Sequence, residues 1–131
     1  MGRSLTLRTS DDLLKRLERR AHQVRVPKSA LAGRYLEEGL TMDSFPGIVF
    51  RDGPAGRRAG VVGGPDVWEV IQALHAEDGD VVATADMLGL RPGLVDAARA
   101  YYETNAAVTD SWIESNATLM EEAGQPGPRP A

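Results

Sequence analysis

Near its start the chain reads Ser4-Leu5-Thr6-Leu7-Arg8, a stretch in which polar and apolar side chains alternate. This two-residue period predicts a short strand with Leu5 and Leu7 on one face and the three polar side chains on the other. No partner strand follows nearby, and an unpaired strand in water is neither stable nor protected from aggregation. We therefore expect pairing with the same strand of a second copy, in an antiparallel ribbon that buries both leucines. Such a ribbon fits the major groove of DNA.

Two helices are predicted after this strand. Thr9-Ser10-Asp11-Asp12 supplies an N-cap and acidic residues for a first turn, which predicts a helix from Asp11 to about Val24. Val26-Pro27 ends that helix and allows a second to begin near Pro27. The helical spacing rests on two apolar stripes: Leu13, Leu14, Leu17, Ala21 and Val24 in the first helix, and Leu31, Tyr35, Leu36 and Leu40 in the second.

The order strand, helix, helix resembles the ribbon-helix-helix family of Arc- and CopG-type repressors and the antitoxins built on them. The likeness is carried by residues 4–8, by the stripe of the first helix, and by Val26-Pro27-Lys28-Ser29-Ala30-Leu31. The resemblance implies the following DNA contacts: Ser4, Thr6 and Arg8 on base edges, Arg3 beside them, and Lys28 and Ser29 on a phosphate. It also implies a dimer core of Leu5, Leu7, Leu14, Leu17, Leu31 and Leu36. Pro27 departs from the family pattern, because proline has no amide to offer a phosphate.

The charge of the chain is divided unevenly along its length. Residues 1–34 carry nine Lys or Arg against three acidic residues, whereas residues 35–131 carry six Arg against sixteen acidic residues. The net charge of −4 therefore conceals a basic head (residues 1–34) and an acidic body (residues 35–131). This asymmetry is typical of a protein that binds nucleic acid with one end and another partner with the other.

The acidic body begins with a predicted hairpin and continues with helices. Two short strands are expected at residues 45–50 and 59–62, separated by a Gly/Pro/Arg loop at 51–58, after a polar joint at 41–45. A helix over residues 67–76 should bury Val67, Val70, Ile71 and Leu74. A short helix capped by Asp80, carrying Val82, Ala85 and Leu88 and ended by Gly89, precedes a longer helix from Pro92 to about Thr104. That is the outline of a helix-turn-helix. From Pro65 to Asn105, however, eight acidic residues stand against two arginines, and this charge balance favours a structural or protein-binding role over DNA binding.

This region resembles the small domain of unknown function 433, found among VapB-like antitoxins. The likeness is carried by Phe45-Pro46-Gly47-Ile48-Val49-Phe50, the hairpin, Asp66-Val67-Trp68-Glu69-Val70 and the helix-turn-helix. The resemblance implies a toxin–antitoxin context beside a PIN-like ribonuclease. Gly63-Gly64-Pro65-Asp66 replaces the usual Gly-Thr-Arg before the helix.

A final amphipathic helix is expected from a cap near Thr109 to Gly124, with an acidic outer face. Its apolar stripe comprises Trp112, Ile113, Asn116, Leu119 and Met120. The stripe suits packing on its own domain and docking in a partner's groove equally well. The toxin-binding candidates are Trp112, Ile113 and Met120, or Arg91 and Arg99 if an arginine must block an acidic active site. Residues 125–131 are rich in proline and glycine and are expected to be disordered.

Composition argues against an enzyme. The chain has no cysteine, and His22 and His75 stand alone in the sequence, so we expect no catalytic residue, no cofactor and no metal site. No apolar run approaches the roughly 18 residues needed to cross a bilayer, so we expect a cytoplasmic protein that does not bind membranes.

These observations predict a mainly α protein with four parts: residues 1–42, 43–106, 107–123 and 124–131. The first part is a dimerising, DNA-binding ribbon-helix-helix, the second a hairpin with helices, the third an amphipathic helix, and the fourth a tail. The expected function is an antitoxin that forms a dimer or a higher even oligomer, binds operator DNA, represses its own operon and neutralises a PIN-like ribonuclease. The alternatives are a dimeric repressor without a toxin, whose second domain senses a ligand or oligomerises, and a scaffold protein with an incidental basic helix pair.

Overall fold

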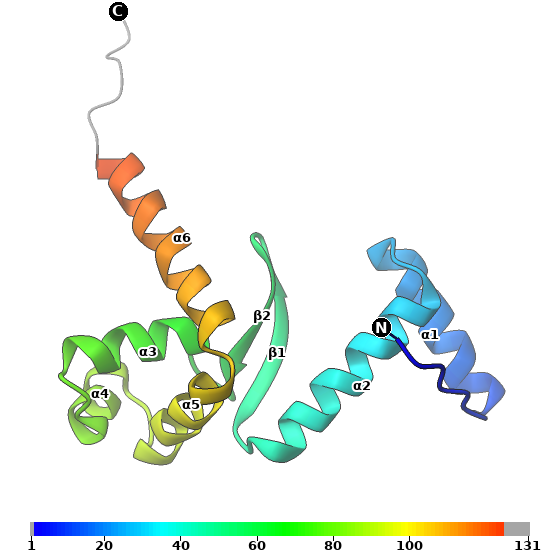
Figure 1. The fold of residues 1–131 in the computed structure, drawn as a ribbon, viewed down its shortest axis with the longest axis horizontal. Helices are drawn as coiled ribbons and strands as arrows, with labels where there is room; N and C mark the ends of the chain where they lie inside the picture. Colours follow the sequence, from blue (N-terminus) through cyan, green and yellow to red (C-terminus); the bar gives the residue numbers. More distant parts are fainter. Residues whose placement is uncertain (1, 125–131) are drawn as a thin grey trace, which may run out of the picture. The chain divides into compact units, whose positions relative to one another are not determined.

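The computed structural model describes residues 2–124 and divides the chain into two units, Met1–Leu40 and Thr41–Ala131. Within the described residues the chain forms six helices and one antiparallel hairpin (Figure 1). The elements are α1 (Asp11–Val24), α2 (Lys28–Ser44), β1 (Ile48–Gly53), β2 (Gly56–Val61), α3 (Val67–Ala76), α4 (Val81–Leu88), α5 (Pro92–Thr104) and α6 (Ala106–Gly124). The predicted mainly α class with a small hairpin is confirmed.

Local capping determines both ends of α1. The Ser10 hydroxyl accepts a hydrogen bond from the Leu13 amide at 3.2 Å, and Asp11 and Asp12 occupy the first turn, where their charge favours the helix dipole. At the other end Arg25 adopts a left-handed conformation (φ 57°), and its amide bonds to the carbonyls of Ala21 and His22. The predicted helix from Asp11 to Val24 is confirmed residue for residue.

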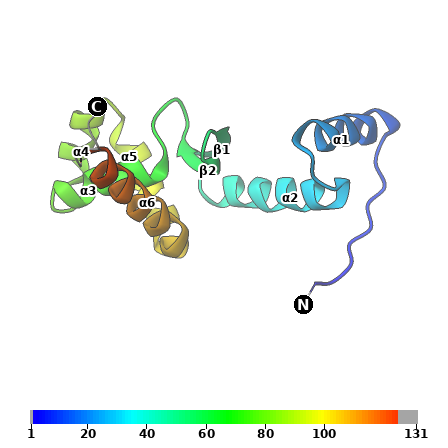
Figure 2. The same cartoon turned by 90° about the horizontal axis from the view of Figure 1, so that it is seen from above.

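Residues 2–10 form neither a helix nor a strand in the single chain (Figure 2). Leu5 and Leu7 are 70% and 62% exposed. The strand predicted over residues 4–8 is thus not formed by one chain alone, because strand hydrogen bonds need a neighbouring strand and the described chain offers none beside it. The intermolecular ribbon stays a prediction.

The second helix runs further than predicted. Residues 41–44, expected as a polar joint, are the last turn of α2, and the Phe45 amide bonds to the Thr41 carbonyl at 2.9 Å. The helix ends there because the residue before a proline disfavours the helical conformation, and Pro46 follows Phe45.

The hairpin is displaced from its predicted place and its turn is shorter. The first strand begins at Ile48 instead of Phe45, and the second covers Gly56–Val61 instead of residues 59–62. Ile48 pairs with Val61, and the register continues to Gly53 opposite Gly56, so only Pro54 and Ala55 lie in the turn. The predicted 51–58 loop is therefore wrong. Gly56 follows the turn at φ 124°, a conformation that side chains with a Cβ rarely adopt, and this permits the tight reversal.

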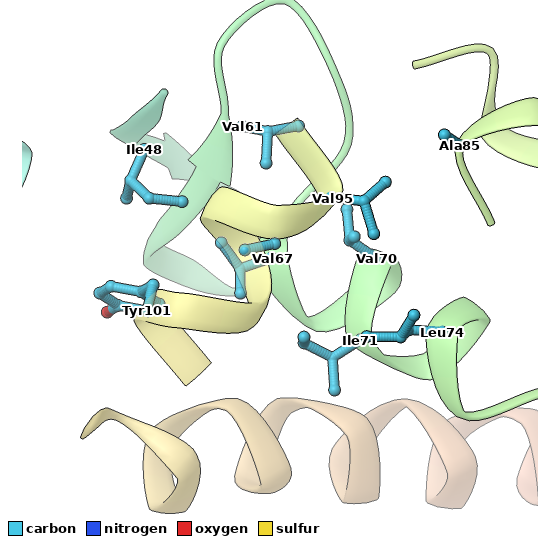
Figure 3. Close-up of a cluster of buried hydrophobic side chains, with 10 residues drawn as sticks. Ile48, Val61, Val67, Val70, Ile71, Leu74, Ala85, Val95 and Tyr101 are labelled. Carbon is cyan, nitrogen blue, oxygen red and sulfur yellow. The ribbon is translucent and has the colours of Figure 1, made fainter. Parts of the chain in front are cut away.

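The core of the second unit lies between the hairpin and α3, α4 and α5 (Figure 3). The predicted stripe of α3 is confirmed, because all four of its members are buried. In α4 the Asp80 carboxylate accepts from the Ala83 amide at 3.0 Å, and Gly89 closes the helix in a left-handed conformation, as expected. Of the apolar residues predicted for this helix, Val82 is 60% exposed, because the buried face of α4 carries Thr84 and Ala85.

The last helix begins at Ala106, three residues before the predicted cap. Thr109 is therefore not a cap: it is buried in the first turn, and its hydroxyl donates to the Asn105 carbonyl at 3.2 Å. The first half of α6 packs against α3 and α5, whereas residues 117–124 are exposed throughout and extend beyond α3 (Figure 1). The helix includes Gly124, and the rest of the predicted tail lies outside the described residues.

Candidate functional site

The predicted DNA-contact residues of the first unit are all exposed. They are Arg3, Ser4, Thr6, Arg8, Lys28 and Ser29. Lys28 at the start of α2 lies 3.7 Å from a Glu18 carboxylate oxygen of α1, with both side chains half exposed. An exposed pair of this kind is worth little, so the Lys28 ammonium can exchange that contact for a phosphate at small cost.

The predicted dimer core is split between buried and exposed positions. Leu31 is fully buried, Leu14 and Leu17 are half-buried, and Leu36 is exposed like Leu5 and Leu7. Two further apolar side chains, Leu13 of α1 and Tyr35 of α2, are also exposed. A single chain therefore leaves an apolar face uncovered on this unit.

A hollow of about 540 Å³ lies on this face. Its lining is amphipathic: Leu13, Leu17 and Tyr35 supply apolar surface, and Arg16, Arg19, Arg20 and Gln23 supply polar groups. Uncovered apolar surface bordered by arginines is suited to a second protein copy and a polyanion on the same unit.

In the second unit, the Asp66 carboxylate organises the entry to α3. It pairs with the Arg58 guanidinium, accepts from the Trp68 indole at 3.2 Å, and lies 3.5 Å from Arg51 Nε. Arg51 Nη2 also donates to the carbonyls of Gly64 at 2.8 Å and Pro65 at 3.0 Å. These contacts join the hairpin to the Gly-Pro loop that precedes α3. Sequence reasoning missed them, because the partners are eight to fifteen residues apart and no motif marks them.

A groove of about 370 Å³ opens beside this carboxylate. It is lined by three elements: the hairpin turn with Pro54, Ala55 and Arg58, the start of α3 with Asp66, Trp68 and Glu69, and α6 with Trp112, Ser115, Asn116 and Leu119. A Cβ atom at Gly56 would lie 4.0 Å from the Trp112 ring, so that ring reaches the hairpin turn. Both tryptophans of the chain line this cavity, which we name the tryptophan groove.

The structure separates the predicted toxin-binding residues. Trp112 lines the tryptophan groove, Ile113 packs against the core, and Met120 is 67% exposed and not part of the groove lining. Arg91 is the exposed N-cap of α5, and Arg99 pairs with Asp96 at 3.0 Å on the surface. Trp68, Glu69 and Leu119 were not among the candidates, because the groove that they share arises only from tertiary packing.

A polar contact fastens α6 to α5. The Tyr102 hydroxyl donates to an Asp110 carboxylate oxygen at 2.7 Å, and the His75 ring of α3 meets the Tyr102 ring edge-on, with centroids 5.9 Å apart. The hydrogen bond to Asp110 raises the pKa of the Tyr102 phenol, with smaller contributions from desolvation and from the carboxylate charge. The Tyr102 hydroxyl thus joins the two helices as the donor of this hydrogen bond.

No family model, no curated protein and no solved structure matches this chain. The residues described by the structure bring together no group of three or more His, Asp or Glu side chains that could hold a metal ion. Across residues 2–124, none of the helices has the length and apolarity required to span a bilayer.

Proposed function

We propose that the protein is a DNA-binding antitoxin that dimerises through its first unit, represses its own operon, and holds a toxin with its second unit. The observation that carries the proposal is the exposure of Leu5 and Leu7 on a segment whose alternate residues are polar. These leucines lie in the same unit as the uncovered apolar face of α1 and α2. A second copy covers the apolar surface and also supplies the missing strand partner.

Pairing two copies explains the polar positions as well. In an antiparallel ribbon, Ser4, Thr6 and Arg8 stand on the face opposite the two leucines. A two-stranded ribbon enters the major groove, where an arginine side chain can bond to a guanine and hydroxyl groups can bond to several bases. The ribbon then reads sequence, while Lys28 and Ser29 at the start of α2 supply contacts to the phosphate backbone.

Charge supports the same division of roles. The basic head carries a net +6, which favours a polyanion. The acidic body carries a net −10, which opposes contact with a phosphate backbone over most of its surface. We therefore assign DNA to the first unit and a protein partner, a PIN-like ribonuclease toxin, to the second.

A second candidate function is favoured by the tryptophan groove. A cavity of about 370 Å³ lined by two tryptophans and several polar groups is large enough for a small ligand. On this alternative the protein is a dimeric repressor without a toxin, and ligand binding in the second unit adjusts repression.

The test combines the promoter fragment that precedes the protein's own reading frame with the product of the neighbouring gene. We expect the wild-type chain to bind the fragment as a dimer and to bind the neighbouring protein and suppress its ribonuclease activity. Repression with no effect on any neighbouring gene product would favour the ligand-sensing alternative. A folded wild-type monomer that ignores the promoter fragment would contradict both.

A further inference from the structure

We propose that the tryptophan groove binds an arginine side chain on an exposed segment of a partner protein. The inference deepens the proposed partner-binding role of the second unit and rests on that part of the proposed function. It does not depend on DNA binding by the first unit.

The walls of the groove suit a flat cation with an aliphatic stem. Trp68 comes from α3 and Trp112 from α6, so two indole rings that are distant in sequence border one cavity. A guanidinium stacks on indole faces better than an ammonium does, because it is planar and weakly hydrated. Leu119 and Pro54 provide apolar surface for the methylene groups of the same side chain.

The position of Trp68 is fixed before any ligand arrives. Its indole donates to the Asp66 carboxylate at 3.2 Å, and the same carboxylate pairs with Arg58. Within the groove lining the Asp66 carboxylate therefore offsets the Arg58 charge, and the same carboxylate also lies 3.5 Å from Arg51 Nε. A wall that is ordered in advance lowers the entropy lost on binding.

The second carboxylate at the groove is that of Glu69. One of its oxygens accepts the Asp66 amide at 3.3 Å, and the side chain is otherwise exposed. Glu122 lies three residues beyond Leu119 and so on the same face of α6. The whole of α6 contains four acidic residues and no basic one. This surface repels anions and attracts a cationic segment.

The test uses tryptophan fluorescence, because the only two tryptophans of the chain both line the groove. The probe is the peptide acetyl-Ala-Leu-Arg-Leu-Ala-amide, and its control carries citrulline, a neutral isostere, in place of arginine. We expect saturable quenching by the arginine peptide with a dissociation constant of about 0.1–1 mM, and binding of the citrulline peptide that is weaker by about fivefold or more.

Matched variants locate the binding site. Leu119 and Met120 are neighbours with similar exposure, 62% and 67%, yet only Leu119 lines the groove. We expect Leu119→Ala to weaken binding of the arginine peptide by about threefold to tenfold and Met120→Ala to leave that binding unchanged. Glu69→Gln should also weaken binding of this peptide, because glutamine keeps an acceptor for the Asp66 amide but removes the negative charge of Glu69.

Several outcomes would overturn the inference. These are no quenching by the arginine peptide, equal binding of the citrulline peptide, or equal loss in the Leu119 and Met120 variants. Two further outcomes would assign the groove to a different occupant: emission that changes with protein concentration alone would indicate a second copy, and emission altered by Arg129→Ala without peptide would indicate the chain's own residues 125–131. Promoter binding is measured on the same preparations. It distinguishes the absence of arginine binding in the tryptophan groove from the absence of DNA binding by the first unit.

Discussion

Replacing Leu7 with alanine tests the intermolecular ribbon on which the proposed function depends. In the single chain 62% of Leu7 is exposed. Burying a whole leucine side chain contributes about 1.5–3 kcal/mol, so covering the exposed fraction contributes about 1–2 kcal/mol. Alanine retains about a third of that surface, which leaves a loss of about 0.6–1.3 kcal/mol per copy. A symmetric dimer suffers the loss twice, so its dissociation constant should rise about 8- to 80-fold.

The assay is sedimentation equilibrium over protein concentrations from about 0.1 to about 100 µM, a range that spans the expected shift. Leu119→Ala is the matched control, because Leu119 is also 62% exposed in the single chain but belongs to the second unit. We expect the control to dimerise like the wild type.

Three results would refute the reasoning. The first is a wild-type chain that stays a folded monomer across the whole concentration range. The second is a Leu7→Ala dimer as stable as the wild type. The third is an equal loss in both variants, which would place the dimer contact outside the ribbon.

Three further predictions test separate parts of the molecule. Arg8→Ala should lower discrimination at particular base pairs by about 1–3 kcal/mol, whereas Lys28→Ala should weaken binding to all DNA sequences alike. Titration against single-base variants of the promoter fragment measures both effects. Asp66→Asn should lower the free energy of unfolding of the second unit by about 2–3 kcal/mol in urea, below the full effect of breaking a buried pair because the arginines are partly exposed. Asp52→Asn, which removes half of a partly exposed pair, should cost no more than about 1 kcal/mol, and equal losses would contradict the central role of Asp66. The raised pKa of Tyr102 means that its hydrogen bond stabilises the fold fully below the unfolded pKa near 10.0, and that this stability is lost as the pH rises through the higher folded pKa. Urea midpoints between about pH 8 and pH 12 should therefore fall for the wild type, and fall less for Tyr102→Phe.

The parts of the fold that depend on neighbouring residues were predicted from the sequence. The ends of α1 and α4 follow from caps at Ser10, Asp80 and Gly89, each of which acts within one turn of the helix. The apolar stripe of α3 follows from helical spacing alone. Such signals are complete within about ten residues, so no knowledge of the fold is needed to interpret them.

The hairpin was misread because its polar residues find partners elsewhere in the chain. Arg51 and Arg58 make residues 51–58 look like a loop, yet both side chains reach Asp66 beyond the second strand. A charged strand residue with a buried ion partner carries no local mark that distinguishes it from a loop residue. The same limit applies to the tryptophan groove: Trp112 was predicted as an anchor, but its neighbour Trp68 lies 44 residues earlier.

The most informative difference between sequence and structure lies at residues 4–8. The alternation of Leu5 and Leu7 with polar residues is a strand pattern, and a chain that supplied its own second strand would pair with this one and cover both leucines. In the single chain the segment is unpaired and the leucines are exposed. On the proposed function the partner is the same segment of a second copy, because an identical segment is complementary to it in an antiparallel ribbon. On that proposal, the second copy covers the apolar surface that Leu5 and Leu7 expose in the single chain.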